Sequence, residues 1–318
     1  MTLRQRLLFA GVLGALLTPQ MSLSAQGTHP ELAGHTFVPS TLLPDPFVET
    51  YLSTVIGLGS AFDYDIAWPV LGEDTLFLTE GSLTWVTVDF DYRQRVTDWL
   101  ALGGQVIAGA RVGTNAASAI SDGVSVATGV RIGGVARLVR SRPLMVSAHL
   151  DVARKDLTLL NILGFAEEVI DSVISGGRLD SLSIAFDYGA WRGHGGLRVA
   201  YTPTRLLGIS AMADVAVGKG LLALEESQLD VDLGASVDFN FHSAGWIPLG
   251  VVLAYRFGTF AERSEGAVGA NHRVMLGVSY MGHADYSVGL EVHGGSIDLP
   301  NSDAIKTTIE GIRMRYYF

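Results

Sequence analysis

The residues that could carry out chemistry in this chain do not assemble into a known catalytic motif. There is no G-x-S-x-G elbow for a serine nucleophile, no H-E-x-x-H pair for zinc and no P-loop. The nearest phosphate-loop candidate, Val217-Gly218-Lys219-Gly220, lacks the required spacing and hydroxyl. The 318 residues include no cysteine, which excludes disulfides, thiolate metal sites and cysteine nucleophiles. The sequence therefore predicts a protein that is not an enzyme and carries no cofactor.

Two histidines are local hints of a serine or metal site. His194 lies in the glycine-rich stretch 193–196, and His242 is followed directly by Ser243. A nucleophile, a base and an orienting group cannot be assembled around either histidine from the sequence. We interpret both as ordinary solvated histidines, the first in a strand interruption and the second in a turn.

Charged residues alternate with apolar ones along many short segments. From residue 86 to 93, even positions are apolar or aromatic, whereas Asp89, Asp91 and Arg93 occupy odd positions. Residues 229–241 show the same alternation without interruption. A period of two is that of a β-strand with one apolar and one polar face. The candidates for the polar faces are Asp89, Asp91, Arg93, Arg111, Arg131, Asp151, Asp214, Asp230, Asp232, Arg256, Arg273, Glu291, Arg313 and Arg315.

About twelve strand-like segments follow one another, and their connections alternate between short and long. We place them at 48–58, 83–95, 100–113, 124–140, 144–154, 182–202, 206–217, 229–241, 247–258, 271–282, 285–295 and 307–318. Hydrophobic residues make up 48% of the chain, yet after the N-terminus no apolar run reaches the roughly 18 residues of a membrane helix. Within 182–202 the apolar residues change phase, which predicts a bulge or break at 189–196.

The last segment, 307–318, places Ile312, Met314 and Tyr316 on one face and ends the chain on Phe318. Following a signal-like N-terminus and many similar strands, this ending resembles the bacterial outer-membrane β-barrel proteins, whose terminal Phe is the assembly signal. The resemblance implies an all-β, antiparallel transmembrane barrel of about twelve strands in the bacterial outer membrane. It also implies contact with outer-membrane lipid and lipopolysaccharide, and recognition of Phe318 by the barrel-assembly machinery.

Three regions divide the chain. Arg4 and Arg6 precede an apolar core and a small-residue stretch, which predicts a signal peptide at 1–25 and export through the periplasm. Residues 26–46 contain four prolines and no periodicity, so we expect a periplasmic or lumenal leader that either plugs the barrel or is extended. The barrel itself is expected at 47–318. The formal net charge of −10 excludes nucleic acid as a partner, since that binding needs a basic face.

One helix and one aromatic ring are expected beside the strands. Apolar residues recur at intervals of three and four over 157–174, which predicts a helix in an extracellular loop, packed over the barrel mouth or folded into the lumen. Aromatic residues gather at the end of the short connections, as in an interfacial girdle. They are Tyr92, Trp99, Tyr201, Phe239, Phe241, Trp246, Tyr280, Tyr286, Tyr316 and Phe318.

The expected function is a narrow passive channel or transporter for small solutes, because twelve strands lie between filled eight-stranded barrels and wide sixteen-stranded porins. Its lumen-facing candidates are Asp214, Asp230, Asp232, Arg256, Arg273, Glu291, Arg313 and Arg315. Alternatives are a closed structural or adhesive barrel and, less favoured, a barrel-embedded hydrolase. Pairing Phe241 with Ile247 across a tight turn makes Asp232 and Arg256 direct neighbours, and acidic loops then predict a weak preference for cations.

Overall fold

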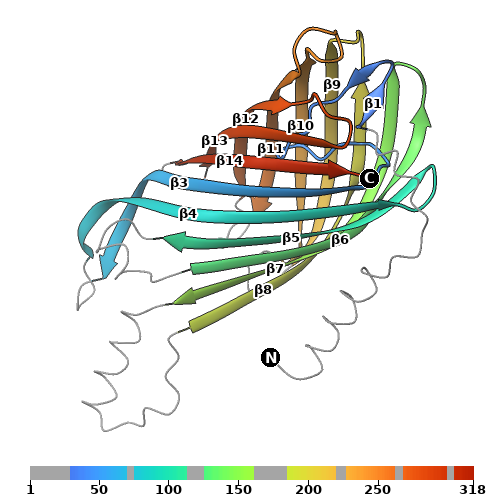
Figure 1. Ribbon diagram of the computed structural model, residues 1–318. Helices are drawn as coiled ribbons and strands as arrows, with labels where there is room; N and C mark the ends of the chain where they lie inside the picture. Colours follow the sequence, from blue (N-terminus) through green and yellow to red (C-terminus); the bar gives the residue numbers. More distant parts are fainter. Residues whose placement is uncertain are drawn as a thin grey trace.

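A computed structural model describes residues 29–69, 75–112, 125–160, 185–219, 227–261, 268–298 and 304–318. Within them, twelve strands close into one barrel (Figure 1). The strands are β3 Tyr51–Pro69, β4 Thr75–Arg95, β5 Leu100–Val112, β6 Ser125–Arg140, β7 Leu144–Leu160, β8 Ala185–Tyr201, β9 Leu207–Lys219, β10 Ser227–Asn240, β11 Leu249–Ala261, β12 Val268–Tyr280, β13 Tyr286–Asp298 and β14 Ile305–Tyr317. Every neighbouring pair is antiparallel, and β14 pairs with β3 to complete the ring. The predicted antiparallel barrel of about twelve strands is confirmed.

Most of these strands are longer than the stretch of clean alternation in the sequence. The first strand, expected at 48–58, begins at Tyr51 and runs to Pro69, and the second starts at Thr75 rather than at residue 83. A tilted strand needs only about 9 to 11 residues to cross a bilayer. Alternation is therefore imposed over the lipid-facing part alone, and the strand ends that extend past it carry no such pattern.

Two local predictions fail for this reason. The strand β7 continues through Leu160, so the helix expected over 157–174 is wrong for 157–160, and its remainder lies outside the described residues. The bulge expected at 189–196 is also wrong, because β8 pairs with β7 in one continuous register from Tyr201 to Ala185. The apolar phase changes along a strand of 17 residues without any slip in its pairing.

The two faces of the wall differ sharply in polarity. On β10, Leu229 is 66% exposed and Leu233 46% exposed, whereas Asp238 is 2% exposed. The strand β13 repeats the pattern, with Leu290 at 64% exposed and Glu291 at 1%. Because apolar side chains point outward and charged ones inward, the barrel has the polarity expected of a wall surrounded by lipid.

Aromatic side chains surround the end of the barrel where the connections are short. Trp99 and Trp246 are exposed there, and Tyr92 stacks on Phe318 with ring centroids 6.3 Å apart. Such rings suit the boundary between lipid and water. No helix in the described residues is long and apolar enough to span a membrane.

The buried apolar core lies inside the barrel, between the wall and the segment that precedes β3. This segment, called the leader below, is the described part of the predicted leader, 29–46, and its continuation 47–50. This segment opens with a small hairpin of β1 Glu31–Leu32 and β2 His35–Thr36. The turn between them is tight, since Ala33 and Gly34 both have positive φ, at 54° and 84°. The segment then runs through the lumen to the start of β3.

Candidate functional site

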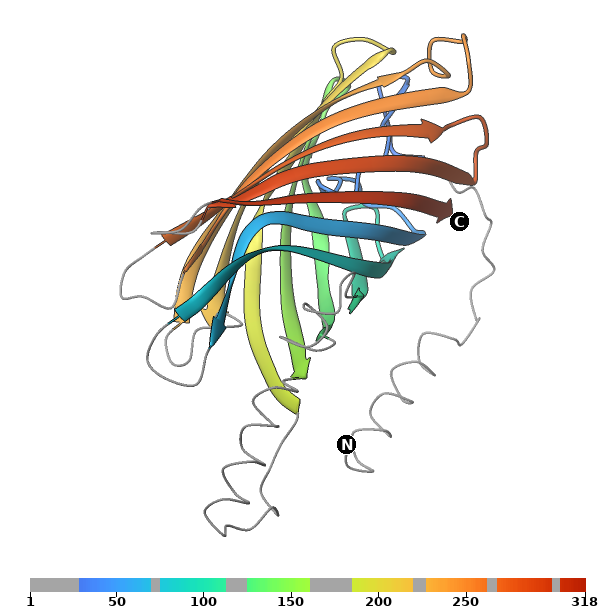
Figure 2. The ribbon, with the colours of Figure 1, turned by 90° about the vertical axis from the view of Figure 1, so that its left-hand side faces the viewer.

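The leader is held first near the short connections (Figure 2). His35 is fully buried, and its Nε2 lies 2.7 Å from Oδ1 of Asp238 while its Nδ1 lies 2.9 Å from the carbonyl oxygen of Arg205. The ring thus lies between two oxygen atoms, one from a side chain and one from the backbone. The backbone N–H of Val38 donates to the same Asp238 oxygen, at 3.1 Å. Asp238, on β10, therefore anchors the segment at two points.

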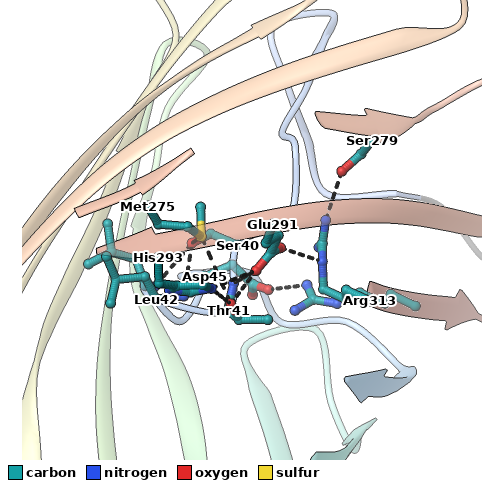
Figure 3. Close-up of polar contacts among 11 residues, drawn as sticks. Ser40, Thr41, Leu42, Asp45, Met275, Ser279, Glu291, His293 and Arg313 are labelled. Atoms are coloured by element: carbon teal, nitrogen blue, oxygen red, sulfur yellow. Dashed lines mark hydrogen bonds and ion pairs between the residues drawn. The ribbon is translucent and has the colours of Figure 1, made fainter. Parts of the chain in front are cut away.

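The apex of the leader reaches β13, three strands round the wall from β10 (Figure 3). The hydroxyl and the backbone N–H of Thr41 both donate to Glu291, whose other carboxylate oxygen lies 2.8 Å from Nε of Arg313. Arg313 in turn donates to Oγ of Ser279 at 2.8 Å, and His293 lies 3.1 Å from the Thr41 hydroxyl. Glu291 and Arg313 are each 1% exposed, so the leader docks on an ion pair buried in the lumen.

A third anchor is Asp45, where the leader turns back toward β3. Its two carboxylate oxygens lie 3.1 Å from Arg93 and 2.6 Å from Arg315, which come from β4 and β14. The ring of Tyr51 stands beside both guanidinium groups, at 5.0 Å and 4.3 Å. Arg198 of β8 donates to the backbone carbonyl of Asp45 at 3.4 Å. One acidic residue thus ties three strands to the leader.

Apolar contacts complete the docking. Val38, Leu42 and Leu43 of the leader form a buried cluster with Met212, Val252, Ala254 and Met275 of the wall. A Cβ at Gly234 would lie 2.3 Å from the Leu43 side chain, and one at Gly250 would lie 2.4 Å from Val38. The wall therefore makes room for the leader with glycines.

A polar cavity remains in the lumen beside the apex of the leader. It has a volume of about 370 Å³, and Ser40, Thr41 and Pro44 form part of its lining. The barrel wall contributes seven cationic and four acidic side chains, a difference of three positive charges. These are Arg93, Arg131, Lys155, Arg198, Arg256, Arg273 and Arg315, with Asp89, Asp91, Asp151 and Asp214.

The lumen-facing candidates with described side chains lie inside the barrel, and most are paired. The ion pairs are Asp230 with Arg192 at 2.5 Å, Asp232 with Arg256 at 3.0 Å, Glu291 with Arg313, and Arg315 with Asp45. Asp214 lies 3.5 Å from Nε2 of His149. Arg273 donates to Asn271 at 3.3 Å. Arg111 lies on β5, and its side chain is outside the described set.

The register behind one of these pairs differs from the prediction. Asp232 faces Gly258, and Arg256 faces Gly234, so the two strands are shifted by two residues from the expected pairing. The Asp232–Arg256 ion pair still forms, because a long guanidinium side chain reaches a diagonal neighbour on the same face. The expected pairing of Asp214 with Asp232 is confirmed.

Several lumen residues were not predicted from the sequence. Arg192 was missed because β8 was expected to break nearby, although its even position puts it on the same face as Arg198. Lys155 lies just beyond the predicted end of its strand. Asp45 and Thr41 carry no local signal, since their partners Arg315 and Glu291 are about 250 or more residues away.

The two histidine candidates do not form a catalytic arrangement. His194 lines the cavity with its Nε2 buried and without a hydrogen-bond partner. Ser243 accepts a hydrogen bond from the backbone of Thr36 rather than from His242. In the described ranges no group of three histidine or acidic side chains is placed to hold a metal ion.

The fold is that of the bacterial outer-membrane β-barrel proteins. Among solved structures, the translocator domain of the autotransporter NalP from Neisseria meningitidis matches with a TM-score of 0.52 over 99% of this chain and 98% of that chain, at 7% identity. An outer membrane channel from Pseudomonas putida F1 matches with a TM-score of 0.52 over 89% of this chain and 100% of that chain, at 11% identity. No family model and no curated protein sequence matches the chain. At such identities the likeness establishes the fold alone.

Proposed function

We propose that this protein is exported through the periplasm to the bacterial outer membrane and forms a narrow, passive channel for small solutes. The observation that supports this most directly is the inverted polarity of the wall. Large apolar side chains such as Leu150, 73% exposed, need lipid around them, while the charged inner face surrounds a cavity of about 370 Å³. In this proposal 1–25 is the cleaved signal peptide.

Placing the barrel in the outer membrane also suggests which molecules it contacts. Outer-membrane lipid and lipopolysaccharide would cover the apolar outer face, and the barrel-assembly machinery would recognise Phe318. The aromatic side chains at the short connections, Trp99 and Trp246 among them, would mark the periplasmic boundary. The leader would then enter the lumen from the periplasm.

The leader makes the channel restrictive. Residues 29–50 are anchored at His35, Thr41 and Asp45, so solutes pass only through the space that the docked segment leaves or when it moves. A closed structural or adhesive barrel is the second candidate, and the observation in its favour is this same filled lumen.

Planar bilayers separate the two candidates. The purified wild-type protein is expected to give small discrete conductance steps, and a variant lacking residues 29–46 is expected to give larger ones. Steps from the deletion variant alone would favour the closed structural barrel, since the leader would then hold the native lumen shut. Silence from both proteins, with folded barrel shown by heat modifiability, would overturn the channel proposal.

A further inference from the structure

Five cations converge on the lumen from strands on nearly opposite sides of the barrel. Arg131 on β6, Lys155 on β7, Arg256 on β11 and Arg273 on β12 line the cavity. The fifth is Arg192 on β8, and its charge, like those of the three arginines, repels that of Lys155. Because β7 and β12 are five places apart in a ring of twelve, this cation cluster spans the lumen.

Among the described residues, carboxylates of the wall pair with only part of the cluster. Three of the five cations are paired, Arg131 with Asp151, Arg192 with Asp230 and Arg256 with Asp232. Over the described ranges, Lys155 and Arg273 have no carboxylate within 4.0 Å. In the described part of the chain, two cations of the cluster that line the cavity are thus left without a paired carboxylate.

Strand pairing also brings two cations of the cluster close together. Arg256 and Arg273 are direct cross-strand partners on β11 and β12, and like charges in that position repel one another. Nε and Nη2 of Arg192 and Nε2 of His194 are buried and have no hydrogen-bond partner among the described residues. Of these residues Arg256, Arg273 and His194 line the cavity, and an anion there would relieve the repulsion between the two arginines.

The wall next to the cation cluster carries hydrogen-bond acceptors. They lie on β4, which is separated from β6 and its Arg131 by β5. Asp89 and Asp91 line the same cavity, and Oδ1 of Asp89 is buried with no hydrogen-bond partner in the part of the chain that the structure describes. Gln105 donates to the other oxygen of Asp89 at 2.7 Å. Carboxylate oxygens accept hydrogen bonds, so this side of the cavity suits hydroxyl groups. The volume of about 370 Å³ falls within the range of roughly 300 to 1,000 Å³ usual for small-molecule sites.

We infer that the cavity binds a small hydroxylated organic anion, its acidic group at Lys155 and Arg273 and its hydroxyls toward Asp89 and Asp91. The inference rests on the proposed channel function and gives that channel a substrate class. It reverses the weak cation preference expected from the sequence, which weighed the acidic loops and did not include Lys155 or Arg192. The site would sit directly beside the apex of the leader at Thr41.

Three probes with a similar carbon skeleton test the inference by calorimetry on the full chain in detergent: gluconate, glucose and glucosamine. Gluconate is expected to bind more tightly than glucose, and glucosamine not to bind. Lys155→Gln should weaken gluconate binding roughly two- to fivefold, the size expected of one charge pair in a wet site. Arg154→Gln is the matched control, because Arg154 pairs with Asp156 on the outer face and should leave binding unchanged.

Uptake of the same three solutes into proteoliposomes separates this inference from the channel proposal. Faster entry of gluconate than of glucosamine, with the preference reduced by Lys155→Gln and by Arg273→Gln, supports both. Entry of all three at equal rates keeps the channel and overturns the anion site. Binding of gluconate without entry of any solute keeps the site and overturns the channel. Equal loss of binding in the Lys155 and Arg154 variants would also contradict the assigned site.

Discussion

Asp45 is the residue on which the internal segment depends most. Burial alone would raise the pKa of its carboxyl group, but the guanidinium groups of Arg93 and Arg315 hold that pKa below its ordinary value. A group with a lowered pKa stabilises the docked state at pH values above its unfolded pKa of about 3.9, and that contribution is lost as the pH falls further. Docking of the leader should therefore persist at neutral pH and weaken below about pH 4.

The variant Asp45→Asn should undock the leader at neutral pH. It leaves Arg93 and Arg315 buried without their shared carboxylate, and breaking a buried ion pair costs about 3 to 5 kcal/mol. We expect longer or larger openings in planar bilayers and faster proteolysis of the leader. Asp285→Asn, an exposed acid at the same end of the barrel, is the control. Unchanged openings and proteolysis in Asp45→Asn would show that the apolar contacts alone hold the leader.

At the scale of the elements, the sequence predicts the part of each strand that faces lipid, and it predicts little of the strand ends and connections. Alternation along β10 was clear because one face must be apolar over its membrane-spanning part, and twelve such segments give the barrel. The strand ends of β3 and β7 were missed because no solvent boundary dictates their pattern. The helix expected from 157 onward is wrong at its start for a related reason. Beyond the lipid-facing part of β7 no alternation is imposed, and apolar spacing in a short window fits a strand and a helix about equally.

The leader could be recognised as a separate segment but its docking could not be predicted. His35 meets Asp238 across 203 positions, and Thr41 meets Glu291 across 250. Such contacts depend on the curvature of the closed wall and on the room left at Gly234. Neither the curvature nor this space can be predicted from a local sequence pattern. The contacts in the lumen can therefore be identified only from the closed barrel.

Two adjacent positions on β5 test the assignment of its faces. Val106 is 48% exposed on the outer face, while Gln105 lines the cavity and bonds to Asp89. Val106→Arg places a charge in lipid near mid-membrane and should cost roughly 2 to 4 kcal/mol. Gln105→Arg adds a cation beside Asp89 in a wet cavity and should cost clearly less. The measurement is the free energy of unfolding from lipid vesicles in denaturant, and equal costs at the two positions would contradict the faces.

At the scale of the whole molecule, closure and lumen chemistry are linked through β14. The strand completes the ring against β3, and its inward side chains Arg313 and Arg315 hold two of the three leader anchors. Its outward side chains Ile312 and Met314 are more than half exposed and belong to the lipid face. The last strand therefore determines both that the barrel closes and that the leader docks.

The end of β14 gives the prediction that concerns assembly. Phe318 contributes little to the folded wall: its backbone N–H lies 3.4 Å from the carbonyl oxygen of Thr50, and its ring contacts only Tyr92 and Tyr316 among the aromatic side chains described. In the proposal that the barrel-assembly machinery recognises Phe318, deleting this residue should sharply reduce the heat-modifiable folded barrel in the outer membrane of cells. Refolding of the same variant into lipid vesicles, where no machinery acts, should stay near the wild-type yield.

Trp246→Ala serves as the control, since it removes a large exposed aromatic from the same rim without touching the chain end. It should assemble normally in cells. If the Phe318 deletion lowers the folded yield equally in cells and in vesicles, the residue stabilises the barrel directly by holding β14 against β3. If it lowers neither yield, the terminal aromatic has no part in assembly. Recognition would then be sought in the outward row of the last strand, where Ile312, Met314 and Tyr316 are exposed.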